Sequence, residues 1–236
     1  MKGFRVLATA WVFGLAMTAA AQAADMPGSW LPDIKKPFYT DLISGWYFRG
    51  DAGYRMNSIG GVAAPPPDSI TSWSMQNGWS VGFGGGYKYQ WFRTDVTVDY
   101  GKRSEFSGNT ATTLGFYSAQ LDAITILGNV YLDLGNWGGF TPYIGAGAGG
   151  SFLRTYQFVA GPWTGIADAG QWNLTWAAMG GVSYQFSPSL LVDLSYRYLS
   201  LGDAASGVGP PGYAQRTIFR DLTAQEIRIG FRWMLD

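Results

Sequence analysis

Residues 226–236 close the chain with Glu-Ile-Arg-Ile-Gly-Phe-Arg-Trp-Met-Leu-Asp, in which large apolar residues alternate with ionic residues and glycine. Successive side chains of a β-strand point to opposite faces, so the apolar residues share one face and the ionic residues the other. This pattern predicts a strand with one face toward lipid and the other toward a polar interior. The apolar face holds Ile227, Ile229, Phe231 and Trp233, and the opposite face holds Glu226, Arg228, Gly230 and Arg232.

The N-terminal end has the pattern of a secretory signal peptide. Two basic residues precede an apolar run over residues 6–17, and Ala21 and Ala23 mark a small-x-small cleavage site. The run is too short and wrongly flanked to span a membrane as a helix. We therefore expect residues 1–23 to be removed during export through the periplasm.

The composition excludes several classes of protein. Cysteine and histidine are both absent, so the chain offers neither a disulfide framework nor an imidazole for catalysis or metal binding. Removal of residues 1–23 takes away two of the 16 basic residues and leaves 14 against 16 acidic ones. This balance gives no basic surface for nucleic acid.

The same composition favours a membrane protein made of strands. Charged residues make up 14% of the chain, against about 25% in an ordinary soluble domain, and aromatic residues reach 17%. No apolar run of 18 residues follows the signal peptide, which argues against spanning helices. Since backbone groups in lipid must be paired within the protein, the remaining spanning structure is a closed β-barrel.

Alternation with a period of two recurs in eight segments, which we predict as strands. Short links follow the second, fourth and sixth, and long links follow the first, third, fifth and seventh, an asymmetry typical of bacterial outer-membrane barrels. We therefore predict an all-β fold, an eight-stranded antiparallel up-and-down transmembrane β-barrel, with ten strands as the alternative if a long loop conceals a hairpin. The predicted strands cover residues 46–56, 79–89, 92–103, 121–134, 141–152, 172–186, 190–198 and 226–236, and the long loops cover residues 57–78, 104–120, 153–171 and 200–223.

A soluble lipocalin-like barrel also alternates, but its apolar residues face inward and its charges face water. The polar face predicted here is mostly Gly, Ser and Thr, with one or two ions per strand. That is too little charge to coat a soluble exterior and enough to fill a narrow lumen, so the membrane barrel is the better interpretation.

Four motifs resemble the OmpA-like, opacity-type family of small outer-membrane barrels common in alphaproteobacteria. They are residues 44–54 (Ser-Gly-Trp-Tyr-Phe-Arg-Gly-Asp-Ala-Gly-Tyr), 128–133 (Gly-Asn-Val-Tyr-Leu-Asp), 141–149 (Thr-Pro-Tyr-Ile-Gly-Ala-Gly-Ala-Gly) and 228–235 (Arg-Ile-Gly-Phe-Arg-Trp-Met-Leu). The resemblance implies the outer membrane of a Gram-negative cell, with a periplasmic tail over residues 24–43 and a barrel over residues 44–236. It also implies that the barrel-assembly machinery reads a C-terminal signal comprising Gly230, Phe231, Trp233 and Leu235, although family members often end on an aromatic residue and this chain ends on Asp236.

The predicted inward faces place charges of both signs in the lumen. An eight-stranded lumen is just wide enough for side chains to fill, and an unpaired ion there would be costly. We expect a paired network that packs the lumen, and we keep a narrow polar pore as the alternative. The network comprises Arg49, Asp51, Arg93, Asp95, Asp99, Asp193, Arg197, Glu226, Arg228 and Arg232, with Arg55, Lys88 and Arg103 also pointing inward.

An enzymatic function fits this sequence less well than a structural one. The hydrolases and transferases built on small barrels use a histidine base, which this chain lacks. Asp95 and Asp99 form a carboxylate pair in the sequence, but Arg93 and Arg103 beside them favour structural ion pairing. We expect no catalytic site, no cofactor and no metal site.

The function that these patterns support is that of a structural and surface protein. We expect a barrel with a packed polar lumen that contributes to envelope integrity, contacts outer-membrane lipid and lipopolysaccharide, and presents loops outward. The Pro- and Gly-rich segments 62–67 and 207–212 and the segment around Pro162 and Trp163 are either contacts for host or surface ligands or inert spacers. The alternative is a narrow porin-like channel for small solutes or ions.

Overall fold

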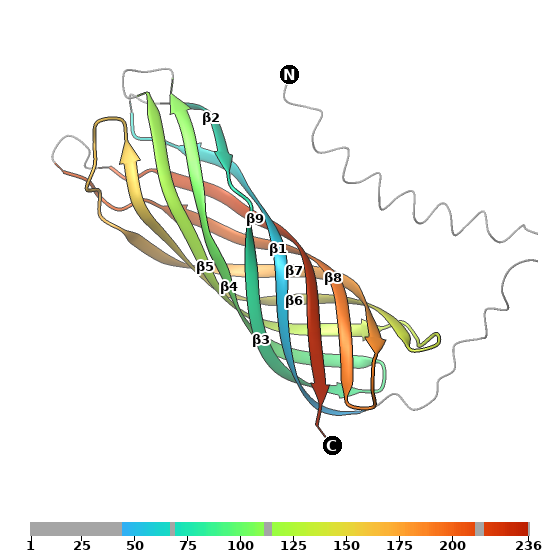
Figure 1. Ribbon diagram of the computed structural model, residues 1–236. Helices are drawn as coiled ribbons and strands as arrows, with labels where there is room; N and C mark the ends of the chain where they lie inside the picture. The colour runs from blue at the N-terminus through green and yellow to red at the C-terminus, as the bar shows by residue number, and fades with distance from the viewer. Residues whose placement is uncertain (1–43, 67–68, 111–114, 211–214, 236) are drawn as a thin grey trace, which may run out of the picture. The chain divides into compact units, whose positions relative to one another are not determined.

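The computed structural model describes residues 44–66, 69–110, 115–210 and 215–235, which form a closed β-barrel (Figure 1). The expected signal peptide, with Ala21 and Ala23, and the expected tail over residues 24–43 lie outside the described residues. Within the described part of the chain, no helix is long and apolar enough to cross a membrane.

Nine antiparallel strand segments build the barrel: β1 (Gly45–Ala63), β2 (Ile70–Met75), β3 (Gly78–Tyr89), β4 (Phe92–Thr110), β5 (Phe116–Asp133), β6 (Phe140–Ala160), β7 (Ala169–Gln185), β8 (Leu190–Ala205) and β9 (Ile218–Met234). Around the ring the order is β4-β3-β1-β9-β8-β7-β6-β5, and pairing of β5 with β4 closes it. β2 pairs with β4 beyond the end of β3, so β2 and β3 share one position. The prediction of eight antiparallel strands is confirmed, and the ten-strand alternative is wrong.

The strands extend far beyond the length that a membrane needs. β4 has 19 residues and β6 has 21, whereas a tilted strand crosses a bilayer with about 9–11. At least half of each segment predicted as a long loop is strand, so that prediction is wrong. The strands keep pairing past the point where their alternation of apolar and ionic residues ends. The connections that remain on this side are residues 64–69, 111–115, 161–168 and 206–217.

An apolar belt surrounds the barrel on its outer face. In β9 the four apolar residues of the C-terminal stretch are each more than half exposed, and the ionic residues between them are buried. Phe48, Phe83 and Leu174 are exposed in the same way on β1, β3 and β7. A belt of large exposed apolar groups is stable only against lipid. The predicted orientation, with apolar residues outward and ionic residues inward, is therefore confirmed.

β-Bulges shift the alternation where the strands leave the belt. In β4 the register shifts between Gly101 and Ser104, so Lys102 and Arg103 are both exposed. The prediction that Arg103 points into the lumen is therefore wrong, because a bulge adds a residue that strict alternation does not count. Gln157 in β6 and Asp221 in β9 mark similar irregularities, with φ values of 46° and 52°.

Candidate functional site

The barrel interior is the candidate functional site, and it contains two zones of opposite character. The ionic zone lies inside the apolar belt and is lined by Arg49, Asp51, Arg55, Lys88, Arg93, Asp95, Asp99, Asp133, Asp193, Arg197, Glu226, Arg228 and Arg232. The apolar zone lies toward the loops and includes Ile59, Phe106, Tyr117, Leu121, Leu153, Phe158, Leu199, Leu201, Phe219 and Leu222. All ten residues predicted for the lumen network lie in the ionic zone.

Four residues at the centre of the ionic zone form a continuous network. The Arg197 and Arg228 guanidinium groups donate to the two Asp99 carboxylate oxygens, at 2.9 and 2.7 Å. The same two arginines contact Glu226 Oε2 at 2.7 and 3.1 Å. Asp99 lies on β4 and Arg197 on β8, four positions apart in a ring of eight, so this ion pair crosses the full width of the lumen.

A second group of contacts surrounds Asp95. Arg49 Nη1 donates to Asp95 Oδ2 at 2.9 Å and Nη2 donates to Asp51 Oδ1 at 2.8 Å. The Tyr47 hydroxyl donates to Asp95 at 3.0 Å, and the Asn129 amide donates to its other oxygen at 2.8 Å. Buried carboxylates with this many donors are satisfied as ions, which suits a structural role better than an acid–base role.

Asp133 is the residue that sequence reasoning failed to assign to the network. It accepts hydrogen bonds from Lys88 and from Arg93 Nε, the latter at 2.9 Å. The Arg93 guanidinium also lies 4.8 Å from the centre of the Tyr131 ring and 4.5 Å from that of Tyr143, within cation–π range. Alternation along β5 places Asp133 on the inward face, but its partners lie about 40 residues away, beyond what spacing along one strand can indicate.

Most ion pairs join different strands. Spacing along β8 places Asp193 and Arg197 on one face of the strand, but Asp193 accepts a hydrogen bond from Arg232 of β9 at 2.8 Å. A same-strand pair does persist between Glu226 and Arg228. The inward face was therefore predictable from alternation, whereas the partners depend on how the ring closes.

Glycine makes room for several of these ions. A Cβ added at Gly82 would overlap the Asp99 carboxylate, and one added at Gly230 would overlap the Asp51 carboxylate. These inward positions must stay small because the charged groups occupy the space beside them. Gly230 therefore has a packing role in addition to its place in the predicted assembly signal.

The other residues of the predicted assembly signal lie on or near the outer surface. Phe231 and Trp233 are more than half exposed in the apolar belt. The Leu235 N–H donates to the Trp46 carbonyl at 2.8 Å and joins the end of the chain to β1. Recognition of these residues by the assembly machinery remains a prediction.

Aromatic side chains fill the apolar zone. Phe219 packs edge-on against Phe106, with ring centres 4.9 Å apart, and lies 6.2 Å from the ring of Phe158. These residues come from β9, β4 and β6, which are spread around the ring, so their rings meet across the lumen. The prediction of a polar lumen is wrong for this half of the barrel.

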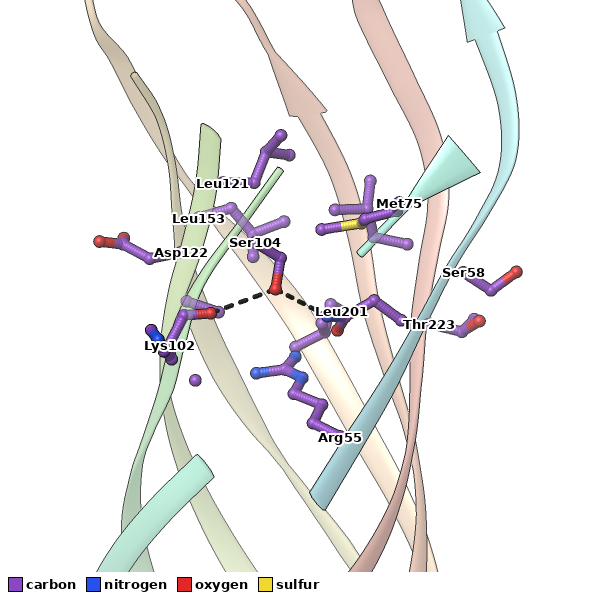
Figure 2. Close-up of a pocket in the computed structure, with 14 residues that line it drawn as sticks. Arg55, Ser58, Met75, Lys102, Ser104, Leu121, Asp122, Leu153, Leu201 and Thr223 are labelled. Atoms are coloured by element: carbon purple, nitrogen blue, oxygen red, sulfur yellow. Dashed lines mark hydrogen bonds between the residues drawn. The ribbon is translucent and has the colours of Figure 1, made fainter. Parts of the chain in front are cut away.

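A small cavity lies between the two zones (Figure 2). Its volume is about 20 Å³, and Arg55, Ser104, Leu121 and Leu153 are among the residues that line it. A second cavity, lined in part by Arg49 and Arg197 and therefore beside the ionic zone, has a volume of about 10 Å³. A cavity needs roughly 10–15 Å³ to hold one water molecule, so neither provides a path for a solute. No group of three or more carboxylates suited to a metal ion occurs within the described ranges.

The closed ring, the apolar belt and the ionic interior define the chain as a small outer-membrane β-barrel. Two solved structures of this class are similar to it in fold. The Neisserial surface protein A (NspA) aligns over 81% of this chain and 98% of its own, with 19% identity and a TM-score of 0.51. The outer membrane protein OprG from Pseudomonas aeruginosa aligns over 81% of this chain and 97% of its own, with 15% identity and a TM-score of 0.52.

Sequence comparison identifies relatives of similar length, although no family model matches the chain. A putative adhesin of Rickettsia canadensis is 30% identical over 203 residues, which cover 79% of this chain and 84% of the relative. An uncharacterized protein of Brucella abortus is 29% identical over 222 residues, which cover 77% and 76% of the two chains. The chain belongs to the same protein family as the rickettsial putative adhesin.

Proposed function

We propose that the protein is a non-conducting structural and surface protein of the outer membrane, which reinforces the envelope and presents its loop-side strands to the exterior. The observation that carries this proposal is the double obstruction of the lumen. Ion pairs cross it inside the belt, and aromatic rings meet across it above the belt. A role in holding lipid and in presenting a surface requires no catalytic chemistry.

Planar-bilayer recording of the purified mature protein tests this proposal. We expect no conductance steps at moderate voltage, because an open path would require both the buried ion pairs and the packed aromatic rings to separate. A steady open level in most insertions would instead support the alternative, a narrow channel for small solutes or ions.

A control variant shows that the recording would detect a conducting barrel. Simultaneous replacement of Arg197, Arg228 and Phe219 by Ala removes side chains from both zones. We expect this variant to conduct once it is inserted in the bilayer, since it lacks part of the ion-pair network and part of the aromatic cluster that close the lumen. A matched Glu105→Gln variant changes an exposed polar position on β4 and should stay as silent as the parent protein.

Adhesion is a second candidate function, and the name of the rickettsial relative favours it. The loop-side ends of the strands would then provide the contact surface. Expression in a non-adherent bacterial host should increase binding to cultured animal cells, and replacing residues 161–168 with a Gly-Ser linker of equal length should reduce it. Unchanged adhesion in the expressing host, with the protein folded at the surface, would contradict this role.

A further inference from the structure

We propose that Lys102, Arg103 and Arg154 form a binding site on the outer wall of the barrel for the phosphorylated headgroup of an outer-leaflet glycolipid of the lipopolysaccharide type. This cluster, called the outer cation site below, includes Asp122 and Tyr156, which hold the two arginines in place. The inference rests on the position of the barrel in the membrane and is independent of whether the lumen conducts.

The bulge in β4 brings two cations to the outer surface. Lys102 and Arg103 are consecutive residues, and in a regular strand one of them would point into the lumen. Because the register shifts between Gly101 and Ser104, both are exposed. The bulge therefore concentrates positive charge at one point of the wall.

A buried carboxylate on the neighbouring strand holds Arg154 in place. Asp122 points away from the interior cavity (Figure 2), yet only 3% of its surface is exposed. Arg154 covers it and donates two hydrogen bonds, from Nε at 3.0 Å and from Nη2 at 3.2 Å. Arg103 Nη2 lies 4.0 Å from the same carboxylate.

An aromatic ring orders the second arginine. The Arg103 guanidinium carbon lies 3.9 Å from the centre of the Tyr156 ring, and that of Arg154 lies 5.4 Å from it. The side chains of Arg103 and Arg154 are 42% and 36% exposed, so both stay accessible. Each guanidinium carries five N–H donors, more than these contacts use, and two ordered guanidinium groups suit the oxygens of a phosphate.

The register places this cluster at the edge of the apolar belt. Ile124 pairs with Phe152, and Phe152 pairs with the exposed Trp172, within the last apolar row on this side. Asp122 and Arg154 form the pair one outward-facing step nearer the loops. The loop side of an outer-membrane barrel faces the exterior, so the cations lie at the depth of the outer-leaflet headgroups.

A shallow apolar groove beside the cluster favours a lipid over a free phosphate. Tyr54, Trp79, Val81 and Ile227 contribute to its lining on the outer face of β1, β3 and β9. Lys102 Nζ lies 5.7 Å from the centre of the Trp79 ring, at the end of this groove. A glycolipid can place its phosphate on the cations and an acyl chain along the groove, whereas inorganic phosphate uses the cations alone.

Binding of labelled rough lipopolysaccharide to the mature protein in zwitterionic detergent tests the inference. We expect the variant combining Lys102→Gln, Arg103→Gln and Arg154→Gln to lose affinity about 100-fold, from roughly a fivefold loss for each charge near an anionic surface. Arg220→Gln is the matched control, because Arg220 is exposed on β9 nearer the loops, and it should bind like the parent protein. Dephosphorylated lipopolysaccharide should bind weakly to all variants, and inorganic phosphate should fail to displace the intact lipid.

Three outcomes would overturn the inference: equal binding by the triple variant and the parent, equal binding of phosphorylated and dephosphorylated lipid, or complete displacement by inorganic phosphate. Heat-modifiable gel mobility checks that each variant is folded. If the triple variant does not fold because Asp122 loses its partner, Arg103→Gln alone serves, with an expected loss of about fivefold. An unchanged affinity in that folded single variant would likewise overturn the inference.

Discussion

The two halves of this barrel share the same strands but have opposite polarity. Inside the belt region, apolar side chains face outward and thirteen ionic side chains face inward. In the loop-side region, Phe106, Leu199 and Phe219 face inward, while Glu105, Asp203 and Arg220 are exposed. The surroundings explain the difference, because lipid accepts apolar groups on the outside and water does not. The loop-side region therefore resembles a soluble barrel built on top of a membrane barrel.

This comparison separates two sources of stability. In the belt region, the apolar groups of the outer face stay in lipid and gain little from the hydrophobic effect, so the interior depends on ion pairs and hydrogen bonds. In the loop-side region, burial of apolar groups away from water supplies the stabilisation. The two zones meet near Arg55 and Ser104, beside the bulge that shifts the alternation of β4.

The largest effect is expected from breaking the ionic zone. Glu226→Gln removes the carboxylate that contacts Arg197, Arg228 and, at 3.7 Å, Arg55, and leaves buried positive charge uncompensated. We expect the free energy of unfolding to fall by about 3–5 kcal/mol. Urea unfolding in detergent micelles measures it, with the exposed Glu105→Gln as control. A loss below about 1 kcal/mol would show that the network is not essential to stability.

Truncation in the apolar zone should cost nearly as much. Phe219 is fully buried and contacts Phe106 and Phe158, so Phe219→Ala should destabilise the barrel by about 3–4 kcal/mol. The matched variant Phe231→Ala, on the lipid-facing side of the same strand, should cost clearly less in the same unfolding assay. Equal losses at the two positions would contradict the division into two regions.

The third-largest difference is expected from a cation added to the outer face, which should destabilise the belt region and not the loop-side region. Ile229→Arg places a cation in the belt and should cost about 2–4 kcal/mol in lipid vesicles. Ser107→Arg places the same group on the outer face of β4 in the loop-side region, where the change should stay within about 0.5 kcal/mol. Similar costs at the two sites would mean that both lie in the same environment.

The smallest expected effect concerns the inward glycines. Gly82→Ala forces a methyl group against the Asp99 carboxylate and should destabilise by about 1–3 kcal/mol. Gly50→Ala is the matched control, because a Cβ at that exposed position meets nothing within 4 Å. Chemical unfolding should show a loss for the first variant and none for the second; equal behaviour would contradict tight packing around the ions.

The sequence was sufficient to predict the number of strands and the inward direction of the ionic residues inside the apolar belt. Alternation gives these directly, since it depends only on neighbours along one strand. It could not predict that Arg103 faces outward, because bulges change the count, nor that Arg93 pairs with Asp133, because partners depend on ring closure. The loop-side parts of the strands were not predicted, because their apolar residues face inward and their polar residues face outward. The pattern used to recognise strands, with apolar residues outward, therefore stops at the edge of the belt although the strands continue.

Accessibility scanning along β9 tests the central claim most directly. The chain contains no cysteine, so single-cysteine substitutions from residue 218 to 233 give unambiguous sites for a spin label in lipid vesicles. The account predicts that residues 227, 229, 231 and 233 are accessible to oxygen in lipid, that residues 218 and 220 are accessible to a water-soluble relaxant, and that residues 219 and 228 are accessible to neither. Lipid accessibility at residue 219, or water accessibility at residue 228, would contradict the inversion of polarity within one strand.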